Sequence, residues 1–228
     1  MKILGIESSS LVASIALVDE EKVIAEYTIN FQQTHSQILL PMIQEIFFRM
    51  GITIQDIDAI AVSSGPGSFT GLRIGSATAK GLGMALNKPL IPVPTLEAMA
   101  YGLYQVKSLI CPLMDAKRQQ VYTGLYEFSP EFKVVESGAA MALTEVISHI
   151  NAKNREVIFL GDGTDVSLGL LQKELTVPYT LAPVYANRQR AAVLASLSLL
   201  YYKEKKLLSA KDYIPEYFRA SSAERLKE

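Results

Sequence analysis

The hydrophobic positions along the chain change repeatedly from short runs to longer helical segments. Short apolar or alternating runs predict strands, and longer periodic segments predict helices. In the first half this pattern predicts three strands, a helix, a strand, a Gly-rich helix, a short strand and a further helix. These elements are expected at 2–7, 13–18, 22–29, 36–50, 57–63, 70–86, 90–93 and 95–104.

The second half of the chain repeats the order of the first. Its predicted elements lie at 109–114, 121–128, 132–137, 144–151, 156–160, 166–174 and 188–205. The order βββαβα thus occurs twice, without obvious sequence identity between the copies. Strands interleaved with helices imply layered α/β domains with mixed sheets. We expect one domain at 1–103, a second at 104–205, and a tail at 206–228 that packs back on the first domain.

This duplicated order resembles the actin-like ATPase (ASKHA) fold of sugar kinases and Hsp70. In that superfamily a nucleotide binds between the two halves. The resemblance lies in the topology alone, and topology says little about activity.

Composition and charge place the chain among ordinary globular proteins. Of its 228 residues, 49% are apolar and 20% are charged, which excludes a mainly disordered protein. Lys and Arg total 22 and Asp and Glu total 23, so the net charge is −1. A protein that holds nucleic acid by itself normally has a basic excess, because neutralised phosphates supply most of the affinity. The balance therefore argues against independent nucleic-acid binding.

Three features of the sequence favour a cytoplasmic protein without membrane association. Cys111 is the only cysteine, so no internal disulfide can form, which is typical of a reducing compartment. The N-terminal apolar run meets Glu7 too early for a signal peptide. The longest apolar stretch, 191–202, is interrupted by Ser196 and Ser198 and is too short to span a bilayer.

The usual signatures of metal sites and catalytic nucleophiles are missing from the sequence. His35 and His149 are the only histidines and lie far apart, so no pair at i, i+4 can bind zinc on a helix. No Gly-x-Ser-x-Gly elbow occurs, and Cys111 stands in an apolar run before Pro112, as a buried structural thiol would. We therefore expect no metal, no cofactor and no catalytic residue.

The run GPGSFTGLRIG at 65–75 follows a predicted strand and opens a helix, where backbone N–H groups favour an anion. It fits neither phosphate-binding template. In a P-loop the second Gly is followed by Lys and then by Ser or Thr, whereas Leu72 and Arg73 follow Gly71 here. The dinucleotide pattern needs a third Gly at the position of Thr70. A tight strand-to-helix turn is the favoured interpretation, and direct phosphate binding is the alternative.

The helix after this run carries a stripe of small residues spaced four apart. Gly71, Gly75, Ala79 and Gly83 share one face, which lets another helix approach closely. The preceding helix at 36–50 is apolar around most of its circumference, as a helix buried on all sides would be. We predict that both helices form an interface with another chain. A wholly internal core is the alternative.

Two carboxylates end the first strand of each copy. Glu7 is followed by Ser8 and Ser9, and Asp115 by Ala116 and Lys117. In actin-like folds such positions face the nucleotide and can hold a metal–phosphate group. A turn cap at Glu7 and a local ion pair between Asp115 and Arg118 are the alternatives. The segment Gly161-Asp162-Gly163 could wrap a phosphate or form only a turn.

Five segments of the chain resemble the TsaB (YeaZ) family. They are 2–10 (KILGIESSS), 35–43 (HSQILLPMI), 65–75, 114–126 (MDAKRQQVYTGLY) and 214–219 (IPEYFR), the last followed by Ala223-Glu224. The sequence departs from the family pattern at two places. Glu7-Ser8-Ser9 stands where Asp-Thr-Ser is usual, and Lys117 replaces an Arg.

The resemblance implies an actin-like fold and a non-catalytic role in tRNA modification. TsaB proteins are paralogues of TsaD, the subunit that transfers threonylcarbamoyl to N6 of adenosine 37 of tRNA. They pair with TsaD, or with a second TsaB in a homodimer, and the P-loop ATPase TsaE joins them. The tRNA would be held mainly by the partner. TsaD binds its metal with a helical His-x-x-x-His, and Thr95 and Met99 stand at those two positions here.

The resemblance also implies where the partner binds and where a nucleotide would lie. The expected partner interface consists of His35, Leu39, Leu40, Ile43, Phe47, Gly71, Arg73, Ile74, Gly75, Ala79, Lys80 and Gly83. The expected nucleotide-proximal residues are Glu7, Ser8, Ser9, Asp115, Gly161, Asp162 and Gly163. The alternative function is a small actin-like ATPase or kinase that uses Glu7 or Asp115 with Mg²⁺.

Overall fold

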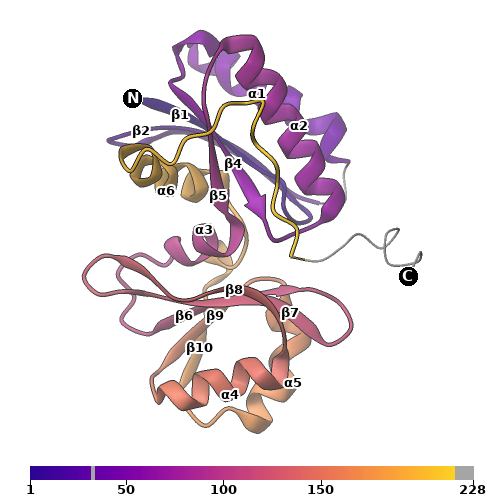
Figure 1. Ribbon diagram of the computed structural model, residues 1–228, viewed down its shortest axis with the longest axis vertical. Coiled ribbons are helices and arrows are strands. Elements are labelled where there is room, and N and C mark those ends of the chain that lie inside the picture. The colour runs from indigo at the N-terminus through magenta and orange to yellow at the C-terminus, as the bar shows by residue number, and fades with distance from the viewer. Residues whose placement is uncertain (32–33, 219–228) are drawn as a thin grey trace. The chain divides into compact units, whose positions relative to one another are not determined.

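The computed structural model describes residues 1–31 and 34–218 and divides them into two compact units. The first unit contains residues 1–98 and 189–218, and the second contains Met99–Arg188. Each unit is built on one five-stranded sheet (Figure 1).

The first unit has the strand order β3-β2-β1-β4-β5. Strands β1, β2 and β3 pair antiparallel, whereas β1, β4 and β5 pair parallel, so the sheet is mixed. The strands are β1 (Lys2–Glu7), β2 (Val12–Asp19), β3 (Val23–Asn30), β4 (Ala59–Gly65) and β5 (Leu90–Pro94). The helices are α1 (His35–Met50), α2 (Phe69–Leu86), α6 (Ala191–Lys203) and the 3-10 turn η1 (Ile54–Asp56). The boundary between the units falls inside α3 (Thr95–Tyr101), after Ala98.

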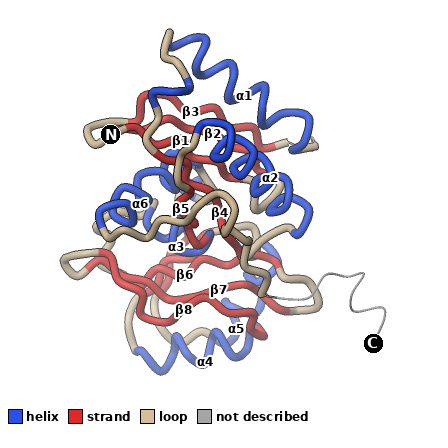
Figure 2. The backbone as a smooth tube through the Cα atoms, turned by 45° about the horizontal axis from the view of Figure 1, so that its top comes forward, coloured by secondary structure: helices blue, strands red, loops and turns tan. Residues whose placement is uncertain are grey.

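Alternation along β1 explains why this sheet has helices on both faces. Leu4 and Ile6 point into a core that α1 and α2 cover. Gly5 points to the other face, where a Cβ would lie 2.9 Å from the Ala195 Cβ of α6. Helices α1 and α2 contact each other and lie side by side over their face (Figure 2).

The second unit repeats the topology of the first. Its order is β10-β9-β6-β7-β8, in which β6 pairs antiparallel with β7 and parallel with β9. The elements are β6 (Leu109–Asp115), β7 (Gln120–Phe128), β8 (Phe132–Ala142), β9 (Val157–Leu160), β10 (Tyr179–Leu181), α4 (Leu143–Lys153), α5 (Gly163–Glu174) and the 3-10 turn η2 (Val184–Ala186). The predicted α/β class with a duplicated order and mixed sheets is confirmed.

The expected domain range 104–205 is wrong at its end, because α6 belongs to the first unit. The N–H of Ala191 donates to Ser14 Oγ at 3.0 Å, and that of Ala192 to Glu26 Oε1 at 2.9 Å. Ser14 lies on β2 and Glu26 on β3, so the start of α6 is fixed to the first sheet. Its small alanines fit the space that Gly5 leaves open.

The described part of the tail also lies on the first unit (Figure 1, yellow). Leu208 and Leu90 exchange backbone hydrogen bonds of 2.9 Å, and Ala210 and Tyr213 are buried in the core. Residues 219–228, which include the quoted Arg219 and Ala223-Glu224, lie outside the described residues.

Candidate functional site

The glycines of the 65–75 run let α2 approach the end of β1 very closely. A Cβ at Gly71 would lie 2.1 Å from the carbonyl oxygen of Ser8, and one at Gly67 would lie 2.3 Å from that of Ser9. The Ser68 N–H donates to the same Ser9 oxygen at 2.6 Å. These backbone groups are used inside the protein, which supports the interpretation as a tight turn.

The stripe of small residues on α2 faces the interior. A Cβ at Gly75 would lie 2.1 Å from Ser8 Oγ, and one at Gly83 would lie 3.0 Å from the Ala210 Cβ. Ala79 is fully buried in the same core. The prediction that Gly71, Gly75, Ala79 and Gly83 face another chain is therefore wrong, because residues of the first unit already fill that side.

The predicted interface residues on α1 are mostly part of the core as well. Leu39, Ile43 and Phe47 are buried, because that side of α1 packs on β2 and α2. The Nε2 of half-buried His35 lies 3.2 Å from the Val12 carbonyl oxygen. Leu40 is the exception, since it is 49% exposed.

Three other predicted interface residues on α2 have internal contacts. Half-buried Ile74 packs against the core. The exposed Arg73 lies over the Phe69 ring, with its Cζ 3.9 Å from the ring centroid. Lys80 Nζ donates to the carbonyl oxygens of Lys211 and Tyr213 at 3.2 and 2.7 Å. Lys80 therefore anchors the tail.

The solvent-exposed sides of α1 and α2 still carry apolar side chains. Phe48 is 78% exposed and Met84 is 59% exposed, and with Leu40 they leave apolar surface on two neighbouring helices. Gly81 lies on the exposed side of α2, and nothing lies within 4 Å of where its Cβ would be. We call Leu40, Phe48, Gly81 and Met84 the outer face. Met84 and Gly81 are not among the predicted interface residues, although their spacing from Ala77 places them opposite the buried stripe.

Glu7 is buried at the end of β1, with 1% of its surface exposed. Burial raises the pKa of its carboxyl group, and hydrogen bonds from Ser9 and Ser63 oppose this only in part. Its Oε1 accepts the Ser9 N–H at 2.6 Å. Ser8, the third predicted residue here, donates from its hydroxyl to the Gly71 carbonyl oxygen at 2.9 Å. This geometry is that of a turn cap.

The matching carboxylate of the second unit has a different environment. Asp115 Oδ2 lies 2.5 Å from Lys117 Nζ, so the local ion pair forms with Lys117 and not with Arg118 as the alternative had it. Burial raises the pKa of Asp115, but the hydrogen bonds from Lys117 outweigh this effect and lower it.

Asp162, from the turn after β9, lies beside Asp115 in the structure. Asp162 Oδ1 accepts the Asp115 N–H at 3.3 Å. Gly161 has a φ of +104°, and Gly163 begins α5 against Leu113. Asn187 Oδ1 accepts the Gly161 N–H at 2.7 Å. Asn187 was not predicted, because nothing in the local sequence links it to this turn.

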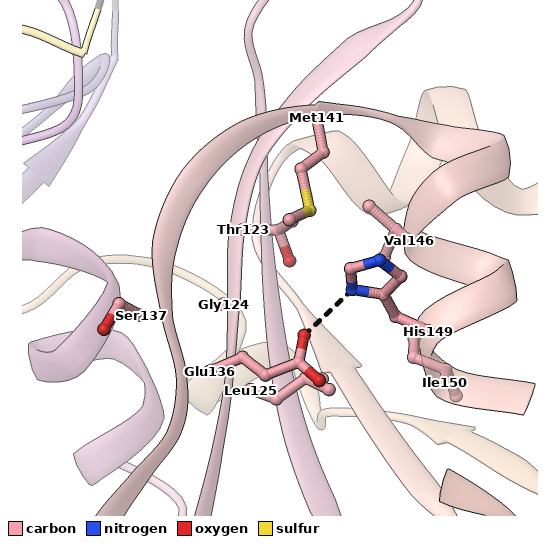
Figure 3. Close-up of a pocket in the computed structure, with 9 residues that line it drawn as sticks. All are labelled: Thr123, Gly124, Leu125, Glu136, Ser137, Met141, Val146, His149 and Ile150. Carbon is pink, nitrogen blue, oxygen red and sulfur yellow. Dashed lines mark hydrogen bonds and ion pairs between the residues drawn. The ribbon is translucent and has the colours of Figure 1, made fainter. Parts of the chain in front are cut away.

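A small cavity in the second unit is lined by β7, β8 and α4 and contains the second histidine (Figure 3). His149 Nδ1 lies 3.0 Å from Glu136 Oε2, and Lys153 Nζ lies 2.8 Å from Glu136 Oε1. The cavity volume is about 10 Å³, which is room for about one water molecule. His149 therefore ties α4 to β8.

Comparison with known proteins decides the family. The sequence model of the family described as TsaD, tRNA N6-adenosine threonylcarbamoyltransferase, matches residues 22–227. The tRNA threonylcarbamoyladenosine biosynthesis protein TsaB of Bacillus subtilis (strain 168) is 34% identical over 226 residues, which is 98% of this chain and 96% of that protein. The chain belongs to the TsaB family.

Solved structures agree with this TsaB assignment. YeaZ from Pseudomonas aeruginosa matches with a TM-score of 0.82 and 26% identity, covering 95% of this chain and 99% of that chain. The activator of the 2-hydroxyisocaproyl-CoA dehydratase from Clostridium difficile, solved with bound ADPNP, covers 97% of this chain and 100% of its own. Its TM-score is 0.51 at 12% identity, so it shows the actin-like fold alone.

At the two positions that the resemblance to TsaD marks as metal ligands, this chain has poor metal donors. Thr95 and Met99 stand four residues apart on α3, and both are buried. A neutral hydroxyl and a thioether do not suit a hard divalent ion. Across residues 1–31 and 34–218, no three His, Cys, Asp or Glu side chains are grouped so that they could hold a metal. No helix in the described structure is long and apolar enough to cross a membrane.

Proposed function

We propose that this chain is a non-catalytic subunit of the machinery that transfers threonylcarbamoyl to N6 of adenosine 37 of tRNA. The observation that carries the proposal is the match to TsaB over almost the whole of both chains. The donors at Thr95 and Met99 support a non-catalytic role, because they could not replace the metal-binding histidines of TsaD.

The proposed partners are TsaD, which supplies the chemistry, and the ATPase TsaE. The tRNA contacts the chain only indirectly, which suits its net charge of −1. We place the chain in the cytoplasm, without membrane association, where it would meet all of these partners.

We place TsaD on the outer face rather than on the small-residue stripe. Leu40, Phe48 and Met84 are exposed apolar side chains, which typically anchor protein interfaces. Gly81 has an open side, so a partner helix could approach α2 closely there. A second copy of the chain on the same face is the competing occupant.

Reconstituted transfer to tRNA tests the function. The reaction is run with TsaD, TsaE, ATP and the threonylcarbamoyl precursors, with this chain present or omitted. We expect transfer to depend on the chain and to be absent when the chain acts alone. Full transfer without the chain would contradict the proposal.

Substitution on the outer face tests the interface separately. Leu40→Asp and Met84→Asp should weaken TsaD binding at least about tenfold, because a charge would be buried in an apolar contact. Val184→Asp is the matched control, since Val184 is an exposed apolar side chain of the second unit. Unchanged binding by both outer-face variants, with circular dichroism showing intact folding, would remove TsaD from this face.

The alternative, a small ATPase or kinase, is not favoured by the two carboxylates. Glu7 is buried and accepts the Ser9 N–H, and Asp115 is paired with Lys117. Neither presents a free carboxylate to a hydrated metal ion. The nucleotide-proximal role of Ser8, Gly161 and Gly163 stays a prediction, which calorimetry with ATP and Mg²⁺ would test.

A further inference from the structure

A cavity of about 630 Å³ lies in the second unit beside the turn between β6 and β7. Its lining comes from Asp115 and residues 117–121 around this turn, from residues 142–144 at the start of α4, and from Val166, Ser167 and Leu170 of α5. This volume lies within the range of small-molecule sites, roughly 300–1,000 Å³. It is far larger than the cavity beside His149, which has room for little more than a water molecule.

One wall of the cavity is cationic. Lys117 and Arg118 both line it, together with a single carboxylate, Asp115. Lys117 is paired with Asp115, whereas Arg118 is exposed and forms no ion pair with any residue that the structure describes. The guanidinium group therefore supplies an uncompensated positive charge whose planar donors suit a carboxylate or a phosphate.

Apolar side chains also line the cavity, together with several uncharged polar ones. The apolar residues are Val121, Leu143, Val166 and Leu170, of which Val166 is 69% exposed. The helix α4 begins beside these residues, at Leu143, and no side chain caps it. The first turn of α4 also carries Glu145, which offsets the positive end of the helix dipole, so the cationic character of the site depends on Lys117 and Arg118.

The turn that carries the cations is fixed in an unusual conformation. Lys117, Arg118 and Gln119 have φ values of 62°, 56° and 59°. This left-handed conformation is unfavourable for residues that have a Cβ, and three in succession are rare. The turn is held by hydrogen bonds from the Ala116 N–H to the Gln120 carbonyl and from the Lys117 N–H to Asp115 Oδ1. Arg118 is thereby presented from a well-defined turn.

We propose that this cavity binds a small organic anion, with its phosphate or carboxylate on Arg118 and its apolar or aromatic part against Val121, Leu143 and Val166. The outer face proposed for TsaD lies on other elements, so this site goes beyond the proposed function and does not depend on it. The cavity volume suits a ligand of about the size of a mononucleotide.

Titration of the isotope-labelled full chain, followed by amide NMR shifts, tests the site. The probes are AMP and hexanoate, with adenosine and hexanamide as their neutral counterparts. We expect saturable shifts at 117–121, 142–144 and 166–170 for at least one anion, and much weaker binding of its neutral counterpart. Saturation by AMP but not by adenosine would show recognition of the phosphate, and saturation by hexanoate but not by hexanamide would show recognition of the carboxylate.

Two variants separate the site from general charge effects. Arg118→Gln should weaken anion binding about tenfold or more, because it removes the charge-assisted hydrogen bonds. Val166→Asp should weaken it as well, by placing a negative charge at the mouth. Arg155→Gln is the matched control, because Arg155 is paired with Glu127 and does not line the cavity.

Three results would overturn the proposal. They are the absence of saturable shifts for both anions up to about 10 mM, saturable shifts confined to residues outside the cavity, and unchanged affinity in Arg118→Gln. None of these results bears on the dependence of threonylcarbamoyl transfer on the chain.

Discussion

The hydroxyl of Ser8 donates a 2.9 Å hydrogen bond to the carbonyl oxygen of Gly71. The same Ser8 oxygen lies 2.1 Å from where a Cβ of Gly75 would be. One side chain at the end of β1 thus fixes the distance to two successive turns of α2. Gly71 and Gly75 are needed for this contact inside the first unit.

Gly75→Ala should destabilise the protein, and Gly81→Ala should not. A methyl group at Gly75 would displace Ser8, and overpacking of this kind costs about 1–3 kcal/mol. Gly81 has open space, so alanine there should stabilise the helix by about 0.5–1 kcal/mol. Denaturant unfolding measures both variants on one helix. Equal stability of the two would contradict the assignment of the stripe to the core.

Lys80→Met should loosen the tail from the first unit. It removes two donated hydrogen bonds to the backbone of Lys211 and Tyr213, which we expect to cost about 1–3 kcal/mol of local stability. Hydrogen exchange at Leu208, whose N–H pairs with the Leu90 carbonyl oxygen, should become faster. Lys173→Met, an exposed change on α5, is the control. Unaltered exchange in Lys80→Met would show that the contact does not hold the tail.

Glu7→Gln should change how stability depends on pH. Burial raises the pKa of Glu7 in the folded state, so the unfolded chain loses its proton at a lower pH than the folded chain. The free energy of unfolding therefore falls as pH rises above the ordinary value of 4.5, until the folded state also ionises. Glu7→Gln should remove this decline in unfolding experiments across pH 4–8. A decline of the same size in the variant would assign it to other groups.

Glu136→Gln should destabilise the second unit at neutral pH but not at acidic pH. Burial disfavours the charged form of Glu136, but hydrogen bonds from Lys153 and His149 outweigh it and lower the pKa. The stabilisation is therefore present above pH 4.5 and is lost as pH falls through the lower pKa of the folded state. We expect a loss of about 1 kcal/mol at pH 7 and little at pH 3. Glu131→Gln, at an exposed carboxylate, should have no such effect in thermal unfolding at the two pH values.

The sequence predicts the order of most strands and helices, because their hydrophobic positions recur with a clear period. The strand β10 was missed, since Tyr179–Leu181 is only three residues long and follows Pro178. The place of α6 was also missed. Its residues follow the second copy in the chain, and only the hydrogen bonds from its start to Ser14 and Glu26 show that it packs on the first sheet.

The candidate site was harder to predict than the fold for a specific reason. A stripe such as Gly71-Gly75 indicates that something approaches closely, but it does not say whether this is Ser8 of the same chain or a residue of a partner. The outer face depends on side chains such as Met84, whose exposure follows from which side of α2 is buried. The cation-lined cavity depends on the left-handed turn at Lys117, which the residue types there do not predict.

The return of α6 to the first sheet has a consequence for synthesis on the ribosome. Residues 1–98 emerge first, but one face of their sheet lacks its covering helix until residues beyond Gln189 have been made. Until then, apolar positions such as Ile3 and the groove at Gly5 have no α6 to cover them. The second unit, continuous from Met99 to Arg188, can complete its own sheet earlier. The part of the chain that is translated first is thus completed last.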